Sequence, residues 1–545
     1  MLKLRPIVHC IALLALSPGL PARAASTPIP HSTQTVRVKP FKILMLTLDE
    51  RPPNYDHVVS LAAVAGSGIE LIIPPLGLMP PSLQAVRTPY DFASIQSWLD
   101  AHYDEADAAV ISPEFFLYGG LVRSREMDID TATAISRLAS LEAILKRNPA
   151  KAYLFTVLSR VAPTQGEGQQ YSDQDWANIT AYSAAADELT QTQDPVRKAQ
   201  LQAQVTALLQ AIPPAFFTQY QNKVARDQAV RTKLLDLLPE VAAIVFSQED
   251  CAPFGLHRQA KASLESALAT LSAADRAKAP VITGLDEVAS LLLGRAYLDG
   301  ARVLPGSIPI QVIPSDPSGM NLVSAYEDIP VEANLLAHLQ IFPQFRLADA
   351  ADIHPARLFI HTFAQSGQQD WESMPAPSSD PSQDAIPSDF LSQITQDSYV
   401  MDIKYSNGGD PNLVNALASR LGIQTVHYSG WNTTGNSMDI LGSIAVRSAA
   451  ENTGTIDPAA SLAYDRIKAL DSMYDAVVRT SLRLVAQDWG DNEWSLDQNS
   501  SFYANQATSL LRGLAGRLGY PADLTGELKV DFPLDRLFEA RISPK

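Results

Sequence analysis

The chain has 545 residues and a formal net charge of −17 at pH 7, and 46% of its residues are hydrophobic. A protein of this length can bury a large apolar core without disulfides, whereas the acidic balance argues against nucleic acid and anionic membrane surfaces as partners. We therefore expect a globular protein that handles small neutral or cationic molecules.

The N-terminus has the pattern of a secretory signal peptide. A basic start precedes an apolar run at 7–16, and an A-x-A cleavage site ends at Ala24. The run is too short for a membrane anchor, so we expect cleavage after Ala24 and a secreted or periplasmic product without membrane contact. Cys10 would leave with this segment. Cys251 would then lack a disulfide partner, which predicts a buried structural cysteine.

Short apolar runs alternate with helical stretches along the rest of the chain. Near-continuous apolar strands are typical of parallel sheets that are buried on both faces. The sequence therefore predicts an α/β fold of mainly parallel sheets flanked by helices, in Rossmann-like layered domains, with a (β/α) barrel as the alternative. The predicted strands lie at 41–46, 69–73, 108–111, 153–157, 243–246, 281–283, 310–313, 358–360, 400–403 and 425–428.

Two segments interrupt this alternation. Residues 176–238 form a helical insertion rich in Ala, Gln and Leu, and residues 365–389 are rich in Ser, Pro, Asp and Gln, which is typical of a flexible loop or linker. The predicted organisation is a signal peptide (1–24), a flexible leader (25–39), a main α/β domain with the insertion (40–364), the loop or linker (365–389), and a C-terminal α/β segment with covering helices (390–545).

Carboxylates, amides and aromatic rings follow many of the predicted strands. Ligands of parallel α/β sheets and of barrels bind beside the carboxyl ends of the strands, so we expect these side chains at one rim. The residues that we expect to bind substrate there are Glu50, Arg51, Asn54, Glu114, Tyr118, Arg160, Asp286, Tyr405, Asn407, Asp410, Trp431, Asn432 and Asn436.

Three further strand-end carboxylates are the candidate catalytic groups. Asp250 and Glu287 would form an acid/base pair, with Asp49 beside them. One carboxyl group can be held protonated as a general acid while its neighbour stays ionised, and both accept hydrogen bonds from sugar hydroxyls. An aromatic ring such as Trp431 offers an apolar face for a sugar ring.

Structural explanations compete with these roles. Asp286 precedes a helical run and has the features of an N-cap, Asp410 and Asp316 precede prolines as in turns or helix starts, and Asp49 with Arg51 can form a simple ion pair. Adjacent acids at a strand end also point to opposite sides, so at most one of each pair should face a cleft.

No standard cofactor motif is present. The sequence has no H-E-x-x-H, no paired C-x-x-C, no G-x-S-x-G and no P-loop, and we assign it no cofactor and no metal site. An oxygen-rich Mg²⁺ or Ca²⁺ site built from Asp49, Asp250 and Asp286 is the alternative.

The same strand ends resemble a bacterial family catalogued as domain of unknown function 4127. The resemblance implies that these residues belong to one site, and it implies no reaction. Two positions depart from the family pattern, Glu249 (more often Asp) and Leu534 (more often Trp), and the first favours Asp250 over Glu249 as a catalytic group. The matching segments, spread over about 40–540, are 48–52 with Asn54, 117–120 with Ser124 and Arg125, 247–250, 285–287, 407–410 and 430–436.

These observations favour a secreted hydrolase of glycosides that uses paired carboxylates. A periplasmic protein that binds a sugar or another polar ligand without chemistry is the first alternative. A cation-dependent hydrolase of amides or phosphoesters is the second. In each case we expect a small-molecule or carbohydrate partner.

Overall fold

The structure is a computed structural model that describes residues 39–80, 89–126, 128–160, 171–373, 386–493, 495–496 and 499–544. The predicted signal peptide and residues 25–38 of the predicted leader lie outside these ranges. Within them, none of the helices combines the length and the apolar character that a membrane crossing requires.

The N-terminal half is built on a parallel sheet, here called sheet A. Its strands run in the order β2-β1-β3-β4-β5-β6, so the chain first adds β2 at the edge beside β1 and then adds β3 to β6 in turn on the other side of β1. The bounds are β1 (Phe41–Leu46), β2 (Ile69–Ile72), β3 (Ala108–Ile111), β4 (Ala152–Leu158), β5 (Ala243–Gln248) and β6 (Val281–Thr283).

A second parallel sheet, sheet B, follows in the order β13-β11-β9-β7-β8. Its strands are β7 (Ile308–Pro314), β8 (Phe345–Leu347), β9 (Ala356–His361), β11 (Tyr399–Asp402) and β13 (His427–Ser429). Two small pairs complete the strands, the parallel β10 (Gln369–Asp370) with β12 (Tyr405–Ser406), and the antiparallel β14 (Leu528–Asp531) with β15 (Arg541–Pro544).

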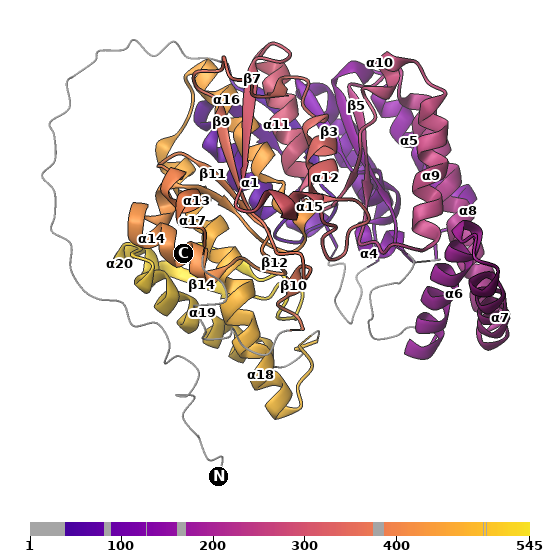
Figure 1. The fold of residues 1–545 in the computed structure, drawn as a ribbon. Helices are drawn as coiled ribbons and strands as arrows, with labels where there is room; N and C mark the ends of the chain where they lie inside the picture. The colour runs from indigo at the N-terminus through magenta and orange to yellow at the C-terminus, as the bar shows by residue number, and fades with distance from the viewer. Residues whose placement is uncertain are drawn as a thin grey trace, which may run out of the picture.

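Helices form three layers around the two sheets (Figure 1). The outer face of sheet A is covered by α2 (Phe92–His102), α3 (Pro113–Tyr118), α5 (Thr131–Leu145), α8 (Pro214–Leu237) and α9 (Leu256–Ala269). The layer between the sheets holds α1 (Asp56–Val64), α11 (Val288–Gly300), α12 (Val331–Leu339) and α16 (Ile440–Thr453). The outer face of sheet B is covered by α13 (Ser388–Gln393), α14 (Pro411–Leu421), α17 (Pro458–Met473), the π-helix η7 (Tyr474–Arg479), α18 (Thr480–Trp489) and α19 (Ser500–Arg517).

The shorter helices lie in the connections. They are α4 (Leu121–Ser124), α10 (Ala273–Arg276), α15 (Thr434–Ser437) and α20 (Ala522–Glu527), with 3-10 turns η1 (Gly66–Gly68), η2 (Leu76–Leu78), η3 (Tyr103–Glu105), η4 (Pro149–Lys151), η5 (Pro317–Asn321) and η6 (Ile423–Thr425).

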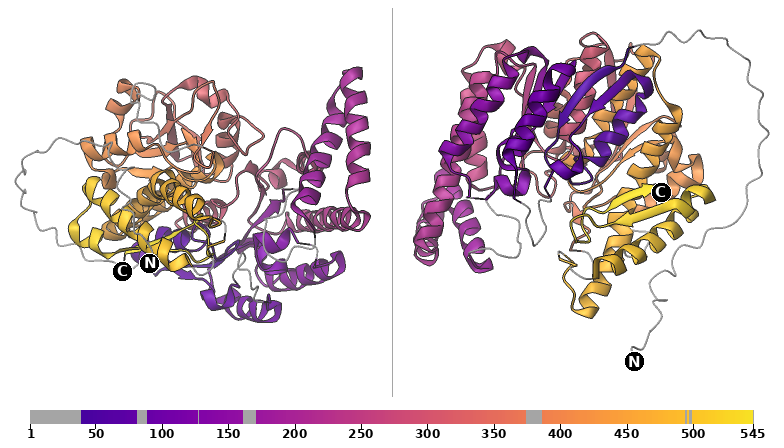
Figure 2. Two further views of the ribbon diagram at one scale, coloured as in Figure 1. Left: turned by 90° about the horizontal axis from the view of Figure 1, so that it is seen from below. Right: turned by 180° about the vertical axis from the view of Figure 1, so that it is seen from behind.

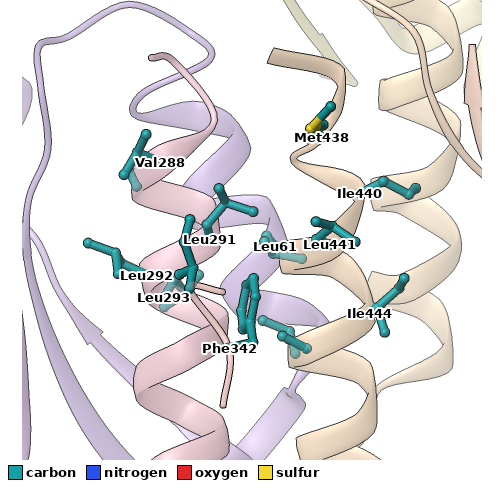
Figure 3. Close-up of a cluster of buried hydrophobic side chains, with 14 of the residues drawn as sticks. Leu61, Val288, Leu291, Leu292, Leu293, Phe342, Met438, Ile440, Leu441 and Ile444 are labelled. Atoms are coloured by element: carbon teal, nitrogen blue, oxygen red, sulfur yellow. The ribbon is translucent and has the colours of Figure 1, made fainter. Parts of the chain in front are cut away.

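One apolar core joins the two sheets through the middle helices. Alternate residues of β1 face opposite layers: Ile43 packs in the core between the sheets and Leu44 in the core on the outer face of sheet A. Figure 3 shows Leu291 of α11 and Leu441 of α16 in this middle layer, both with no exposed surface. The α/β fold with parallel, layered sheets is as predicted, and no closed barrel occurs among the described strands.

The helical insertion consists of α6 (Asp173–Gln191), α7 (Pro195–Ala211) and α8. In Figures 1 and 2, α6 and α7 extend beyond the rest of the molecule. In sheet B, strands β7, β8 and β9 precede the predicted boundary at 365–389 in the sequence, and strands β11 and β13 follow it. The division between the sheets therefore lies before residue 308. Residues 365–389 thus lie between strands of one sheet, and residues 374–385 are outside the described ranges.

Candidate active site

Arg51 is the centre of a buried ion-pair cluster in the loop after β1. Its Nε donates to Asp49 Oδ2 at 2.8 Å, its Nη2 to Asp286 Oδ1 at 2.5 Å and its Nη1 to Glu539 Oε1 at 2.6 Å. Asn54 Nδ2 donates to Asp49 Oδ1 at 3.1 Å and to Asp286 Oδ1 at 2.9 Å. The ends of β1 and β6 therefore meet each other and a residue close to the C-terminus.

The pKa values of two acids in this cluster are shifted in opposite directions. Burial raises the pKa of Asp49 to about 7, although the Arg51 charge opposes this and the neighbouring acids, including Glu50, add to it. Burial also opposes ionisation of Glu539, but the charges of Arg51 and Arg536 outweigh it and lower the pKa of Glu539 to about 2. At neutral pH Glu539 is thus fully ionised, whereas Asp49 is partly protonated.

A second group of charges follows β4 and β5. Glu249 is buried, accepts from the Arg125 side chain and accepts the backbone N–H of Arg160 at 3.0 Å. Arg160 Nη1 donates to Asp250 Oδ2 at 2.6 Å, and the Asp250 side chain is 40% exposed. Asp250 therefore lies at the rim of the site, and Glu249 holds the loops of two strands together.

Glu287 lies in the turn before α11, four residues after β6 ends, and it bonds residues other than Arg51. It has no exposed surface, and its carboxylate bonds His338 Nε2 at 3.1 Å and Asn436 Nδ2 at 2.8 Å. The buried Glu327 accepts from the backbone N–H of Gly435 at 2.5 Å. These acids attach the loop after β13 to the end of sheet A. Asp286 is not the N-cap of α11, because Glu287 occupies that position, and the Asp286 carboxylate binds Arg51 instead.

The remaining predicted residues are buried in structural contacts. Asp410 is the N-cap of α14, with His361 Nε2 at 3.0 Å from its carboxylate, and Tyr405 packs on Trp371 at a ring distance of 4.8 Å. Glu114 accepts from Thr156 Oγ1 at 2.7 Å, and Arg226 lies 4.5 Å from the Tyr118 ring centroid. None of these contacts places the side chain beside Arg51.

A small pocket lies next to Arg51, between the loops of both sheets and the C-terminal segment. Its cavity volume is about 10 Å³, which is room for about one water molecule. It is lined by Pro52, Pro53, Trp431, Asn432, Asp471, Asp475, Phe538, Glu539 and Ala540.

Two of the lining acids come from one helix face. Asp471 lies in the last turn of α17 and Asp475 in the first turn of the π-helix η7, four residues apart. Like charges at this spacing destabilise an isolated helix, and π-helical turns are frequent at functional sites. Burial raises the pKa of Asp475 to about 8. The Arg479 charge acts to lower this pKa, and the charges of Asp471 and Glu539 act to raise it. Burial raises the pKa of Asp471 to about 6, against the Lys468 charge.

The backbone around the pocket is strained. Asn432 has φ +48° and Glu539 has φ +61°, and Asn407, whose backbone N–H donates to the Asn432 carbonyl at 2.6 Å, has φ +59°. Left-handed φ in residues with a side chain costs about 1–3 kcal/mol each and is concentrated at functional sites. Arg479 supports this strand-end turn by donating to the Asn407 carbonyl at 3.2 Å.

The structure thus keeps part of the predicted site and adds residues that the sequence analysis missed. Arg51, Asn54, Asp49 and Asp286 meet, and Trp431 and Asn432 line the adjoining pocket. The missed residues, Asp471, Asp475 and Glu539, do not follow strands. The four-residue spacing of two acids on one helical stretch was the available signal for Asp471 and Asp475. Among the described residues, no group of three or more His, Cys, Asp or Glu side chains is arranged to hold a metal ion.

The family model for proteins of unknown function DUF4127 matches residues 43–543. The chain belongs to this family. The match covers both sheets, the C-terminal helices and the strand ends of the Arg51 cluster. Neither the curated proteins nor the solved structures gave a match. Membership in DUF4127 does not imply a reaction, so the residues of the site are the evidence on function.

Proposed function

We propose that the protein is an exported glycoside hydrolase in which Asp475 is the general acid and Glu539 is the ionised carboxylate. The observation that supports this most directly is the contrast within one pocket wall, where the pKa of Asp475 is about 8 and that of Glu539 about 2. Two carboxyl groups whose pKa values are driven apart by their surroundings take the roles of acid and base.

The chemistry follows from these protonation states. Asp475 donates its proton to the glycosidic oxygen as the bond to the anomeric carbon breaks. The carboxylate of Glu539, held by Arg51 and Arg536, stabilises the positive charge that develops on the sugar. Water then adds to the anomeric carbon and returns a proton to Asp475, so the net reaction is hydrolysis.

Other features of the pocket fit a sugar. Trp431 supplies an aromatic wall, and Asn432 lies beside it. The signal-peptide pattern at 1–24 supports a periplasmic or secreted site of action. We therefore move the acid/base role from Asp250 and Glu287 to Asp475 and Glu539.

The test is turnover of a panel of chromogenic glycosides and oligosaccharides by the mature protein and two variants. Asp475→Asn should lower kcat by roughly 10²–10⁴-fold on oligosaccharides. The loss should be smaller on nitrophenyl glycosides, because that leaving group needs less protonation. Glu539→Gln should slow both classes alike. In the wild type kcat/KM should fall above about pH 8, where Asp475 loses its proton, and this fall should be absent in Asp475→Asn.

Asp236→Asn is the matched control, since this side chain is 61% exposed and lies on α8. It should keep wild-type turnover. Full activity in Asp475→Asn would refute the assignment. Binding of a sugar without any product, over the whole panel, would instead favour the non-catalytic binding protein.

A further inference from the structure

The pocket beside Arg51 is closed in this structure. It has room for about one water molecule, yet Asp475 and Glu539, to which we assign the reaction, both line it. Asp475 belongs to the wall formed by the body of the protein, and the other wall consists of Phe538, Glu539 and Ala540. A sugar ring is far larger than one water molecule, so it reaches Asp475 only if these walls separate.

Residues 538–541, which we call the flap, connect Leu537 to the rest of β15. Leu537 is a fixed point with no exposed surface. Its backbone N–H donates to the Glu493 carbonyl at 2.9 Å, and its carbonyl accepts from the Tyr474 hydroxyl at 2.6 Å. Within the flap, Glu539 has a left-handed φ of +61°, an unfavourable conformation that an outward movement of the flap would relieve.

The charges around Glu539 permit such a movement. Its ion pair with Arg51, at 2.6 Å, attaches the flap to the body of the protein. If this pair separates, Arg51 keeps Asp49 and Asp286, and Glu539 keeps Arg536, which lies three residues earlier in the chain. Separating a buried ion pair is costly chiefly because it leaves a charge unpaired, and here neither charge would be.

Two weaker contacts hold the flap against the body. The Arg479 guanidinium, which pairs with Asp475 at 3.2 Å, lies 4.7 Å from the centroid of the Phe538 ring. Arg541 Nε donates to Asp56 Oδ2 at 2.7 Å, and these two side chains are 24% and 35% exposed. A single cation–π contact and a partly exposed ion pair each contribute little, so the closed state is held by contacts that can be broken individually.

We propose that residues 538–541 act as a flap that closes the pocket and opens about Leu537 to admit the substrate to Asp475. Closure over a bound sugar would return Glu539 to the reacting carbon and exclude bulk water, as the moving loops of other enzymes do. The purpose of the flap rests on the proposed hydrolase function, whereas its movement is measured without any substrate.

The experiment measures how fast a maleimide labels a buried cysteine in the full mature chain, with Cys251→Ser as the background. Ala540→Cys reports on the flap, and Ala449→Cys on α16 is the matched control, since these alanines are 3% and 0% exposed. Local opening costs less free energy than global unfolding, so Ala540→Cys should be labelled at least about 100-fold faster under native conditions. Equal labelling rates for the two cysteines would overturn the inference.

A second reporter, Pro53→Cys, lies on the body wall of the pocket and leaves the flap unchanged. It should also be labelled at least about 100-fold faster than Ala449→Cys. If Ala540→Cys alone is labelled fast, the substitution itself has loosened the flap, and the inference is overturned.

Arg541→Gln removes the ion pair with Asp56 and should raise the labelling rate of Ala540→Cys about 2- to 5-fold, with no change for Ala449→Cys. The two proposals can fail separately. Fast labelling of both reporters without turnover of any glycoside would refute the hydrolase function and leave the flap. Turnover of a glycoside with slow labelling of both reporters would refute the flap and leave the hydrolase function.

Discussion

Asp49 is predicted to make the protein less stable as the pH rises, and Asp49→Asn should remove this effect. The pKa of Asp49 is raised from 3.8 to about 7, or roughly three units at about 1.4 kcal/mol each, which amounts to about 4 kcal/mol. Between these values the unfolded chain has lost the proton and the folded protein keeps it. The free energy of unfolding therefore falls as the pH rises from about 4 to 7, and the loss is complete above pH 7.

The measurement is urea unfolding of wild type and Asp49→Asn from about pH 4.5 to 8, followed by tryptophan fluorescence. Relative to wild type, the variant should gain about 3 kcal/mol of unfolding free energy over this range, whatever their difference at the acidic end. The exposed Asp236→Asn should run parallel to wild type. If the unfolding free energy of Asp49→Asn also runs parallel to that of wild type as the pH changes, the pKa of Asp49 is not raised in the folded protein. The reasoning on the Arg51 cluster would then be wrong.

Three further predictions concern stability. Arg51→Met leaves three buried carboxylates without their shared cation and should cost about 3–5 kcal/mol at pH 8, measured by urea unfolding; a loss below about 1 kcal/mol would contradict the cluster. Gly435→Ala places a Cβ 2.2 Å from the Thr283 carbonyl oxygen and should lower stability by about 1–3 kcal/mol, whereas Gly516→Ala, with open space around it, should not destabilise. Leu291→Ala, in the core between the sheets, should cost about 2–5 kcal/mol, and a smaller change in the same urea titration would mean that this core is loosely packed.

The sequence was sufficient for the parallel strands because those segments are apolar on both faces. The runs at 41–46 and 281–283 coincide with β1 and β6, and the predicted strand at 108–111 with β3. The short edge strand β8 was missed, since Phe345–Leu347 is brief and its Leu347 is 51% exposed. A partly exposed three-residue strand carries too little apolar pattern to be recognised.

The site was harder to predict because its residues depend on tertiary contacts. The strand-end rule located Arg51 and Asp286, since parallel strands bring their carboxyl ends to one edge. It also favoured Glu287, whose partners, His338 and Asn436, are specified only by the packing of distant loops. Glu539 follows no predicted element, and its place in the pocket depends on the β14–β15 pair folding back.

The ion pair between Arg51 and Glu539 spans 488 positions of the chain. A nascent or truncated polypeptide that ends before Glu539 would hold every strand of both sheets and still lack the proposed carboxylate. The proposed site would then be incomplete until residues 528–544 have been synthesised and have folded against Arg51.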